Sequence, residues 1–169
     1  KIGLKALIFL IFLTKSSFAN LKQIKFISYN VWGLPVPIKL KHENLEAIAK
    51  SISYYNADII ALQETFTKRS NILTRISNYP FSAFGNPKSG IKFTSSGLLT
   101  ISKYPILKVK RLQFSKCSGF DCFAAKGVLL TTIDVPHIGP IDVYNTHLNA
   151  GKKRSVKWSQ LYELEAFIK

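Results

Sequence analysis

The chain has few acidic residues for its length and a large excess of basic ones. Nine Asp and Glu residues stand against 24 Lys and Arg residues among 169, which gives a formal net charge of +15 at pH 7. A protein this basic attracts polyanions, such as nucleic acid, anionic lipid headgroups or a phosphodiester substrate. Solvated lysines that only maintain solubility are the alternative explanation for part of this excess. The charge therefore narrows the class of partner without identifying it.

Cysteine is nearly absent, with only Cys117 and Cys122, which have four residues between them. A structural zinc site needs four ligands, so one cysteine pair argues against zinc. In an exported protein the same pair can form a disulfide. No serine lies in a G-x-S-x-G turn, which argues against the nucleophile elbow of serine hydrolases.

No apolar run near the N-terminus is long enough to cross a bilayer. Residues 6–13 are apolar, but Thr14 and Lys15 end the run after eight residues, whereas a spanning helix needs about 20. Two lysines flank the start of the run, and small residues precede Ala19 at its exit, as in a secretory signal. We expect residues 1–19 to be a signal peptide cleaved after Ala19, leaving a secreted protein of charge +12, with a membrane anchor as the alternative.

Hydrophobic periodicity predicts an α/β first half and a β-rich second half in one domain. Predicted helices lie at 42–57, 71–77 and 156–168, and predicted strands at 24–31, 58–62, 97–102, 106–114, 127–135 and 141–146. Residues 80–90, which contain two prolines and two glycines, indicate an irregular loop. The last four strands have little helix between them, which is typical of an antiparallel meander.

Polar side chains adjoin four of the predicted strands, at the ends where ligand groups gather in α/β sheets. Each of these side chains could instead have a purely structural role. Asn30 could form a turn, Glu64 could lie in the first turn of a helix, and His147 could lie at the edge of the core. Asp121 and Lys126 could form a surface ion pair. Their recurrence favours one shared site. A carboxylate and an amide oxygen suit Mg²⁺ held with waters and a substrate phosphate. An imidazole and an ammonium group can stabilise phosphoryl oxygens, so the set predicts phosphoryl transfer.

Five segments, in this order, resemble the endonuclease/exonuclease/phosphatase superfamily, and within it the neutral, Mg²⁺-dependent sphingomyelinase group: YNVWGLP, ALQE, SGLLTISKYPI, CSGFDCFAAKG and NTHL. The resemblance covers residues 22–169 and the first half of the family domain. It implies an α/β fold, an incomplete two-sheet α/β sandwich of the DNase I-like type with mixed and antiparallel strands. It also implies that Trp32 and Phe120 are apolar, membrane-facing groups near the site.

The resemblance assigns a role to each candidate residue. The implied roles are Mg²⁺ binding for Glu64 and Asn30, catalysis for His147, Asp121 and Lys126, and substrate binding for Asn149 and Trp32. The implied reaction is hydrolysis of sphingomyelin at a membrane surface to ceramide and phosphocholine. A secreted DNase-like endonuclease that acts on nucleic acid is the alternative on the same scaffold.

Two later motifs of this superfamily do not occur in the sequence, a G-D-x-N motif and a final Asp–His pair that supplies the general base. A general base alone contributes about 10²- to 10⁴-fold in rate. We therefore expect residues 20–169 to be the N-terminal part of the domain and this chain alone to be inactive. A non-catalytic, truncated binding product is the third interpretation, and the oligomeric state stays open.

Overall fold

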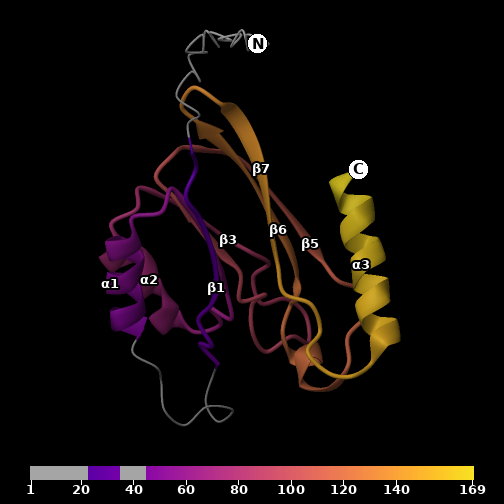
Figure 1. Cartoon of the computed structure of the whole chain (residues 1–169). Coiled ribbons are helices and arrows are strands. Elements are labelled where there is room, and N and C mark those ends of the chain that lie inside the picture. The colour runs from indigo at the N-terminus through magenta and orange to yellow at the C-terminus, as the bar shows by residue number, and fades with distance from the viewer. Residues whose placement is uncertain (1–22, 35–44) are drawn as a thin grey trace, which may run out of the picture.

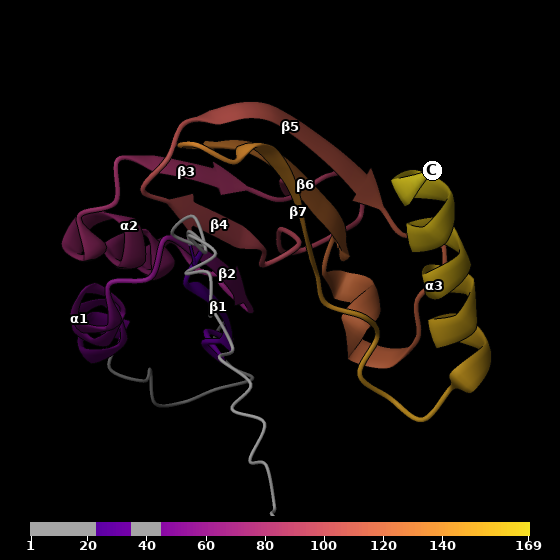
Figure 2. The same cartoon turned by 45° about the horizontal axis from the view of Figure 1, so that its top comes forward.

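Two β-sheets lie face to face between helices in the computed structural model, which describes residues 23–34 and 45–169 (Figure 1). The first sheet has the spatial order β1 (Phe26–Asn30), β2 (Ile59–Gln63), β4 (Leu99–Ser102) and β3 (Phe81–Phe84). The second is the meander β5 (Ile106–Gln113), β6 (Gly127–Val135) and β7 (Gly139–Thr146). Helices α1 (Leu45–Tyr55) and α2 (Asn71–Ser77) cover the first sheet, and α3 (Arg154–Ile168) lies beyond the second (Figure 2).

The first sheet is mixed, because β1 and β2 are parallel while β4 runs antiparallel to both β2 and β3. The β1–β2 register pairs Asn30 with Gln63, so the carboxyl ends of both strands meet at one edge. The second sheet is antiparallel throughout. The predicted α/β sandwich with mixed and antiparallel strands is confirmed.

Strand β2 forms the centre of the core because it is buried on both faces. Ile60 and Leu62 pack with α1 and α2, whereas Ile59 packs with Ile133 and Val143 of the second sheet. Fully burying one such side chain contributes about 1.5 to 3 kcal/mol. The continuous apolar run at 59–62 is therefore explained by a layer on each side of the strand.

One expected loop is wrong in part, because residues 81–84 form strand β3. This strand has four residues, of which only Ala83 is buried, so it shows no apolar alternation. Pro80 precedes its first residue, where the lack of an N–H does no harm to the ladder. Pairing with β4, from Phe81 opposite Ser102 to Phe84 opposite Leu99, creates the strand.

The last helix was predicted from its apolar positions, but it buries few of them. Only Val156 and Gln160 are buried in α3, while Leu161 and Ile168 are exposed. The expected signal peptide and the first three residues of the helix predicted at 42–57 lie outside the described residues. Within residues 23–34 and 45–169, the helices are all too short or too polar to span a bilayer.

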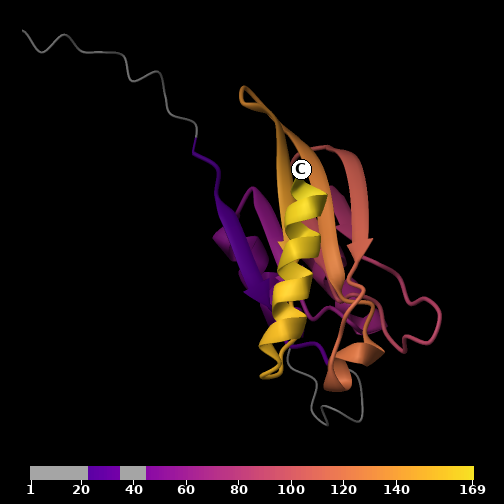
Figure 3. The same cartoon turned by 90° about the vertical axis from the view of Figure 1, so that its right-hand side faces the viewer.

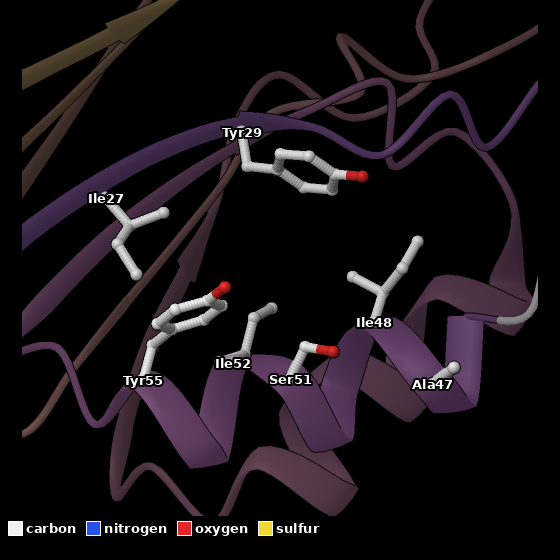
Figure 4. Close-up of a pocket in the computed structure, with 7 residues that line it drawn as sticks. All are labelled: Ile27, Tyr29, Ala47, Ile48, Ser51, Ile52 and Tyr55. Atoms are coloured by element: carbon white, nitrogen blue, oxygen red, sulfur yellow. The ribbon is translucent and has the colours of Figure 1, made fainter.

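A cavity of about 550 Å³ lies between α1 and β1. Figure 4 shows its lining, which contains apolar and hydroxyl side chains and no carboxylate, imidazole or ammonium group; the residues are Ile27, Tyr29, Ala47, Ile48, Ser51, Ile52 and Tyr55. Such a lining offers no acid, base or metal ligand. The candidate site therefore lies elsewhere.

Candidate active site

The parallel β1–β2 pair brings Asn30 and Glu64 into contact. Asn30 ends β1 and Glu64 follows the last residue of β2, and the Asn30 Nδ2 donates to Glu64 Oε1 at 2.9 Å. The Asn30 Oδ1 accepts the backbone N–H of Trp32 at 2.8 Å. The amide thus makes the local turn that the sequence allowed and also orients the carboxylate. Glu64 follows a strand with no helix at that point, so the helical-turn alternative is wrong.

Asn145 joins the second sheet to this edge of the first. Its Nδ2 donates to the carbonyl oxygens of Leu62 and Leu99, both at 3.1 Å, and its Oδ1 accepts from Gln63 Nε2 at 2.9 Å. These bonds fix the position of the end of β7, and His147 follows two residues after the buried Asn145. The sequence analysis missed Asn145. The sequence feature that could have identified it is an Asn inside a predicted strand, since Asn is depleted in strands.

His147 faces Glu64 across the gap between the two sheets. Its Nε2 lies 3.8 Å from Glu64 Oε1, and its side chain is about one quarter exposed. Burial lowers the pKa of His147, and the Lys126 charge lowers it further, while Glu64 and Asp121 oppose the shift. Because the pKa falls below its usual value near 6.5, the imidazole is neutral at pH 7.

Asp121 and Lys126 form a buried ion pair, so the surface alternative for them is wrong. The Lys126 side chain is only 5% exposed, and its Nζ lies 2.8 Å from Asp121 Oδ1. Lys126 also donates to the carbonyl oxygen of Leu148 at 3.0 Å, and Asp121 accepts the backbone N–H of Ala150. Both residues therefore attach the segment before β6 to the segment after His147.

A disulfide between Cys117 and Cys122 closes the loop that carries Asp121. Within this loop residues Gly119–Phe123 form the short 3₁₀ helix η2. Lys92 Nζ donates to the Cys122 carbonyl oxygen at 2.8 Å, and the Phe93 N–H donates to the Phe123 carbonyl oxygen at 2.7 Å. The disulfide and these bonds hold Asp121 and the rings of η2 against their neighbours.

The four ionisable groups share one cavity of about 250 Å³. Its polar lining includes Glu64, Asp121, Lys126 and His147, and aromatic side chains add apolar surface; these are Phe66, Phe120 and Phe123. A pocket with a few convergent polar groups and an apolar lining is typical of a small-ligand site. Two carboxylates, an ammonium group and an imidazole fit a ligand that combines a phosphoryl group with apolar parts.

The structure does not bring Asn149 and Trp32 into the lining of this cavity. Asn149 is buried, with its Oδ1 accepting the Ser118 N–H at 2.9 Å and its Nδ2 donating to Ser118 Oγ at 3.0 Å. Its N–H donates to Gln160 Oε1 at 2.8 Å. Asn149 thus holds the disulfide loop in place, while Trp32 is 53% exposed beside Asn30.

Glu64 supplies the observation that bears on a metal. Among the described residues its buried Oε2 has no hydrogen-bond partner, while Oε1 is bonded to Asn30. The described residues contain no group of three or more His, Cys, Asp or Glu side chains that could hold a metal ion. Mg²⁺ needs no such group, since it is held through one or two carboxylates, waters and substrate phosphates. The donor set of this cavity therefore fits Mg²⁺.

The fold and the site together define a class of protein. The chain belongs to the Endonuclease/Exonuclease/phosphatase family, whose model matches residues 27–167. This match contains every candidate residue named above.

Several relatives of the chain are named as enzymes that act on phosphosphingolipids. The chain is 30% identical to a putative neutral sphingomyelinase of Drosophila melanogaster over 139 residues, which cover 77% of this chain and 30% of that protein. It is 27% identical to the inositol phosphosphingolipids phospholipase C of Schizosaccharomyces pombe, over 76% of this chain and 31% of that protein. The chain thus spans about a third of the length of these two relatives.

A solved structure shares the fold. A mutant of β toxin from Staphylococcus aureus with bound magnesium ions superposes with a TM-score of 0.77 at 22% sequence identity, over 87% of this chain and 59% of that chain. At this identity the likeness establishes the architecture alone, which is the arrangement drawn in Figure 1.

Proposed function

We propose that this chain carries part of the active site of a secreted, Mg²⁺-dependent phosphodiesterase that hydrolyses sphingomyelin to ceramide and phosphocholine. The observation that carries the proposal is the convergence of Glu64, His147 and the Asp121–Lys126 pair in one cavity with an aromatic lining. The names of the relatives support the choice of lipid. The expected signal at residues 1–19 supports secretion.

Glu64 is proposed to bind the metal, and Asn30 to position the Glu64 carboxylate. The Glu64 Oε2 would be the protein ligand, and the Asn30 amide would fix the carboxylate through Oε1. Bound Mg²⁺ would supply positive charge to the phosphoryl oxygens. With one carboxylate as ligand, waters and the substrate phosphate complete the coordination, so binding of the metal alone is expected to be weak.

The other side chains act on the phosphate. Water adds to phosphorus, the bond from phosphorus to the ceramide oxygen breaks, and that oxygen takes up a proton. Neutral His147 donates its N–H to a phosphoryl oxygen, and Lys126, held by Asp121, adds a fixed positive charge nearby. The sequence contains no G-D-x-N or Asp–His pair to accept the proton of the attacking water. This chain alone is therefore expected to give no useful turnover.

Glu64→Gln tests the metal assignment and the reaction. It removes the carboxylate charge with little change of shape, so Mg²⁺ should no longer raise the melting temperature of the chain. In the natural protein that contains this sequence, the variant should lower Mg²⁺-dependent phosphocholine release from sphingomyelin vesicles by about 10³-fold, because metal charge stabilisation is worth several kcal/mol.

Glu46→Gln is the matched control, since Glu46 is an exposed acid on α1 that pairs with Lys50. It should leave the response to Mg²⁺ and phosphocholine release unchanged. Full activity in Glu64→Gln would contradict the metal assignment. An intact mass of the secreted protein well above that of residues 20–169 would show that it contains further residues, among which the general base can be sought.

An endonuclease is the second candidate, and the net charge of +15 is the observation that favours it. Nicking of plasmid DNA with Mg²⁺, without phosphocholine release, would replace the lipid proposal. Binding of either substrate without turnover in the natural protein would identify the non-catalytic product.

A further inference from the structure

Glu64 and His147 each follow the last residue of a strand. Strand β2 ends at Gln63 and β7 ends at Thr146, and each of these residues makes the last pair of the ladder with a neighbouring strand. Strand β1, which is parallel to β2, and strand β7 both run toward the lower end of the molecule in Figure 3. The ladder pairs therefore stop one residue before each of the two site groups.

The His147 ring makes no hydrogen bond to a described residue that would fix its orientation. Its Nδ1 is buried and has no hydrogen-bond partner among these residues. Its Nε2 lies 3.8 Å from Glu64 Oε1, which is beyond hydrogen-bond range. The second ring nitrogen of a functional histidine is often bonded to a carbonyl or carboxylate group, which orients the ring. In this part of the chain the position of His147 therefore depends on how its backbone is held.

The Gln63 side chain connects the end of β2 to the end of β7. The shortest hydrogen bond of its Nε2 goes to Asn145 Oδ1, at 2.9 Å. Asn145 is only 2% exposed, and leaving a buried amide without its partner is costly, so this bond has a strong preference for being made. Because Gln63 precedes Glu64, and Asn145 lies two residues before His147, the bond sets the separation between the two strand ends that carry these groups.

The Thr146 side chain connects the end of β7 to the start of β6. Its Oγ1 donates to the carbonyl oxygen of Gly127 at 2.8 Å, and Gly127 follows Lys126. In the opposite direction the Lys126 Nζ donates to the carbonyl oxygen of Leu148 at 3.0 Å, and Leu148 follows His147. These two bonds link the same two segments on both sides of His147. They therefore hold His147 and Lys126 at a fixed separation.

We infer that Gln63 and Thr146 are positioning residues, which hold the His147 imidazole in place relative to Glu64 and Lys126. Neither side chain lines the cavity, so both act through the backbone of the strand ends. Hydrogen bonds around a site keep its reacting groups within about 0.5 Å of the productive geometry. A misplacement of about 1 Å can cost about 10²-fold in rate. The inference rests on the proposed function for this effect on rate, whereas the positioning itself needs neither metal nor substrate.

Gln63→Met and Thr146→Val test the inference, because each removes a side-chain donor with little change of volume. In proton–carbon NMR spectra of the whole chain, the ring signals of His147 should shift or split in both variants at a temperature well below melting. The loss of these signals in His147→Gln identifies them. In the natural protein that contains this sequence, each variant should lower kcat for phosphocholine release by about tenfold or more, and change KM by less than about twofold.

Thr132→Val is the matched control for Thr146→Val. Thr132 Oγ1 also connects β6 to β7, through Asp142 Oδ1 at 2.6 Å, but it lies further along the two strands and outside the cavity lining. This variant should leave the His147 signals and kcat unchanged. Thr146→Ser keeps the hydroxyl donor, so it should recover the wild-type signals and kcat that Thr146→Val loses.

The ring signals separate this inference from the proposed function. Wild-type ring signals and kcat in both Gln63→Met and Thr146→Val would overturn the inference, even if their melting temperatures fell. Altered ring signals in these variants, together with no phosphocholine release by the natural wild-type protein, would support the inference and count against the proposed function alone.

Discussion

Glu64 and Trp32 both have a left-handed backbone conformation, with φ of 59° and 50°. For residues other than glycine this conformation costs about 1 to 2 kcal/mol. The Asn30 side chain bonds to the backbone of Trp32 and to the side chain of Glu64, which offsets part of that cost. Strained residues concentrate at functional sites, so this pair is independent support for the candidate site.

The Asp121–Lys126 pair gives an asymmetric prediction for stability. Asp121→Asn leaves the nearly buried Lys126 ammonium without its counter-charge and should lower the free energy of unfolding by about 3 kcal/mol. Lys126→Met should cost less, because the Asp121 side chain is 19% exposed and still accepts the Ala150 N–H. Urea unfolding of each variant measures the difference.

The double variant Asp121→Asn/Lys126→Met is the decisive control for the ion pair. It removes both charges together, so its loss should be smaller than the sum of the two single losses. Additive losses would mean that the two charges do not interact.

At the scale of elements, Gly127 allows β6 to approach β5. A Cβ atom built on Gly127 would overlap the Leu112 carbonyl oxygen and lie 2.6 Å from Asn86 Nδ2. Gly127→Ala should therefore destabilise the protein by about 1 to 3 kcal/mol, the usual range for overpacking. It should also disturb the adjoining Lys126. Thermal and urea unfolding of the variant measure the effect.

Gly151→Ala is the matched control, since a Cβ atom there would have its nearest contact at 3.8 Å from Asn149 Nδ2. This variant should change the free energy of unfolding by less than about 0.5 kcal/mol. If both substitutions were equally mild, the close approach of β5 and β6 at Gly127 would not be required for the fold.

At the scale of the whole molecule, the net charge of +15 predicts binding to polyanions that depends strongly on salt. The chain should bind duplex DNA without sequence preference. Its affinity should fall by about tenfold or more between 50 and 200 mM salt, because released counterions drive such binding. Fluorescence anisotropy with two unrelated duplexes measures both properties. An affinity that ignores salt, or that differs strongly between the duplexes, would contradict a purely electrostatic origin.

The outer strands of the two sheets each have one edge that pairs with no strand of the described residues. In the first sheet β1 has β2 as its one partner in this part of the chain, and in the second β7 has β6. Most β1 residues are exposed, including Phe26 and Tyr29. The mixed sandwich is nevertheless recognisable, because its core around β2 is complete on both faces.

The sequence alone determined the element types and the chemistry of the site. Apolar runs and helical spacing predicted the three α-helices of the described residues and six of their seven strands, since these signals come from the burial of side chains. The missed strand β3 has one buried residue and exists through its pairing with β4. The chemical types at the strand ends were sufficient to propose phosphate chemistry.

Only the tertiary structure decided which of these residues meet. The parallel register placed Asn30 against Glu64, and Asn145 brought His147 to the same edge across 83 positions. The tertiary structure also buries Lys126, and it directs the Asn149 side chain to Ser118, outside the cavity lining. Local patterns report which face of an element is buried, whereas contacts between distant strand ends depend on sheet register and packing, which no short stretch of sequence encodes.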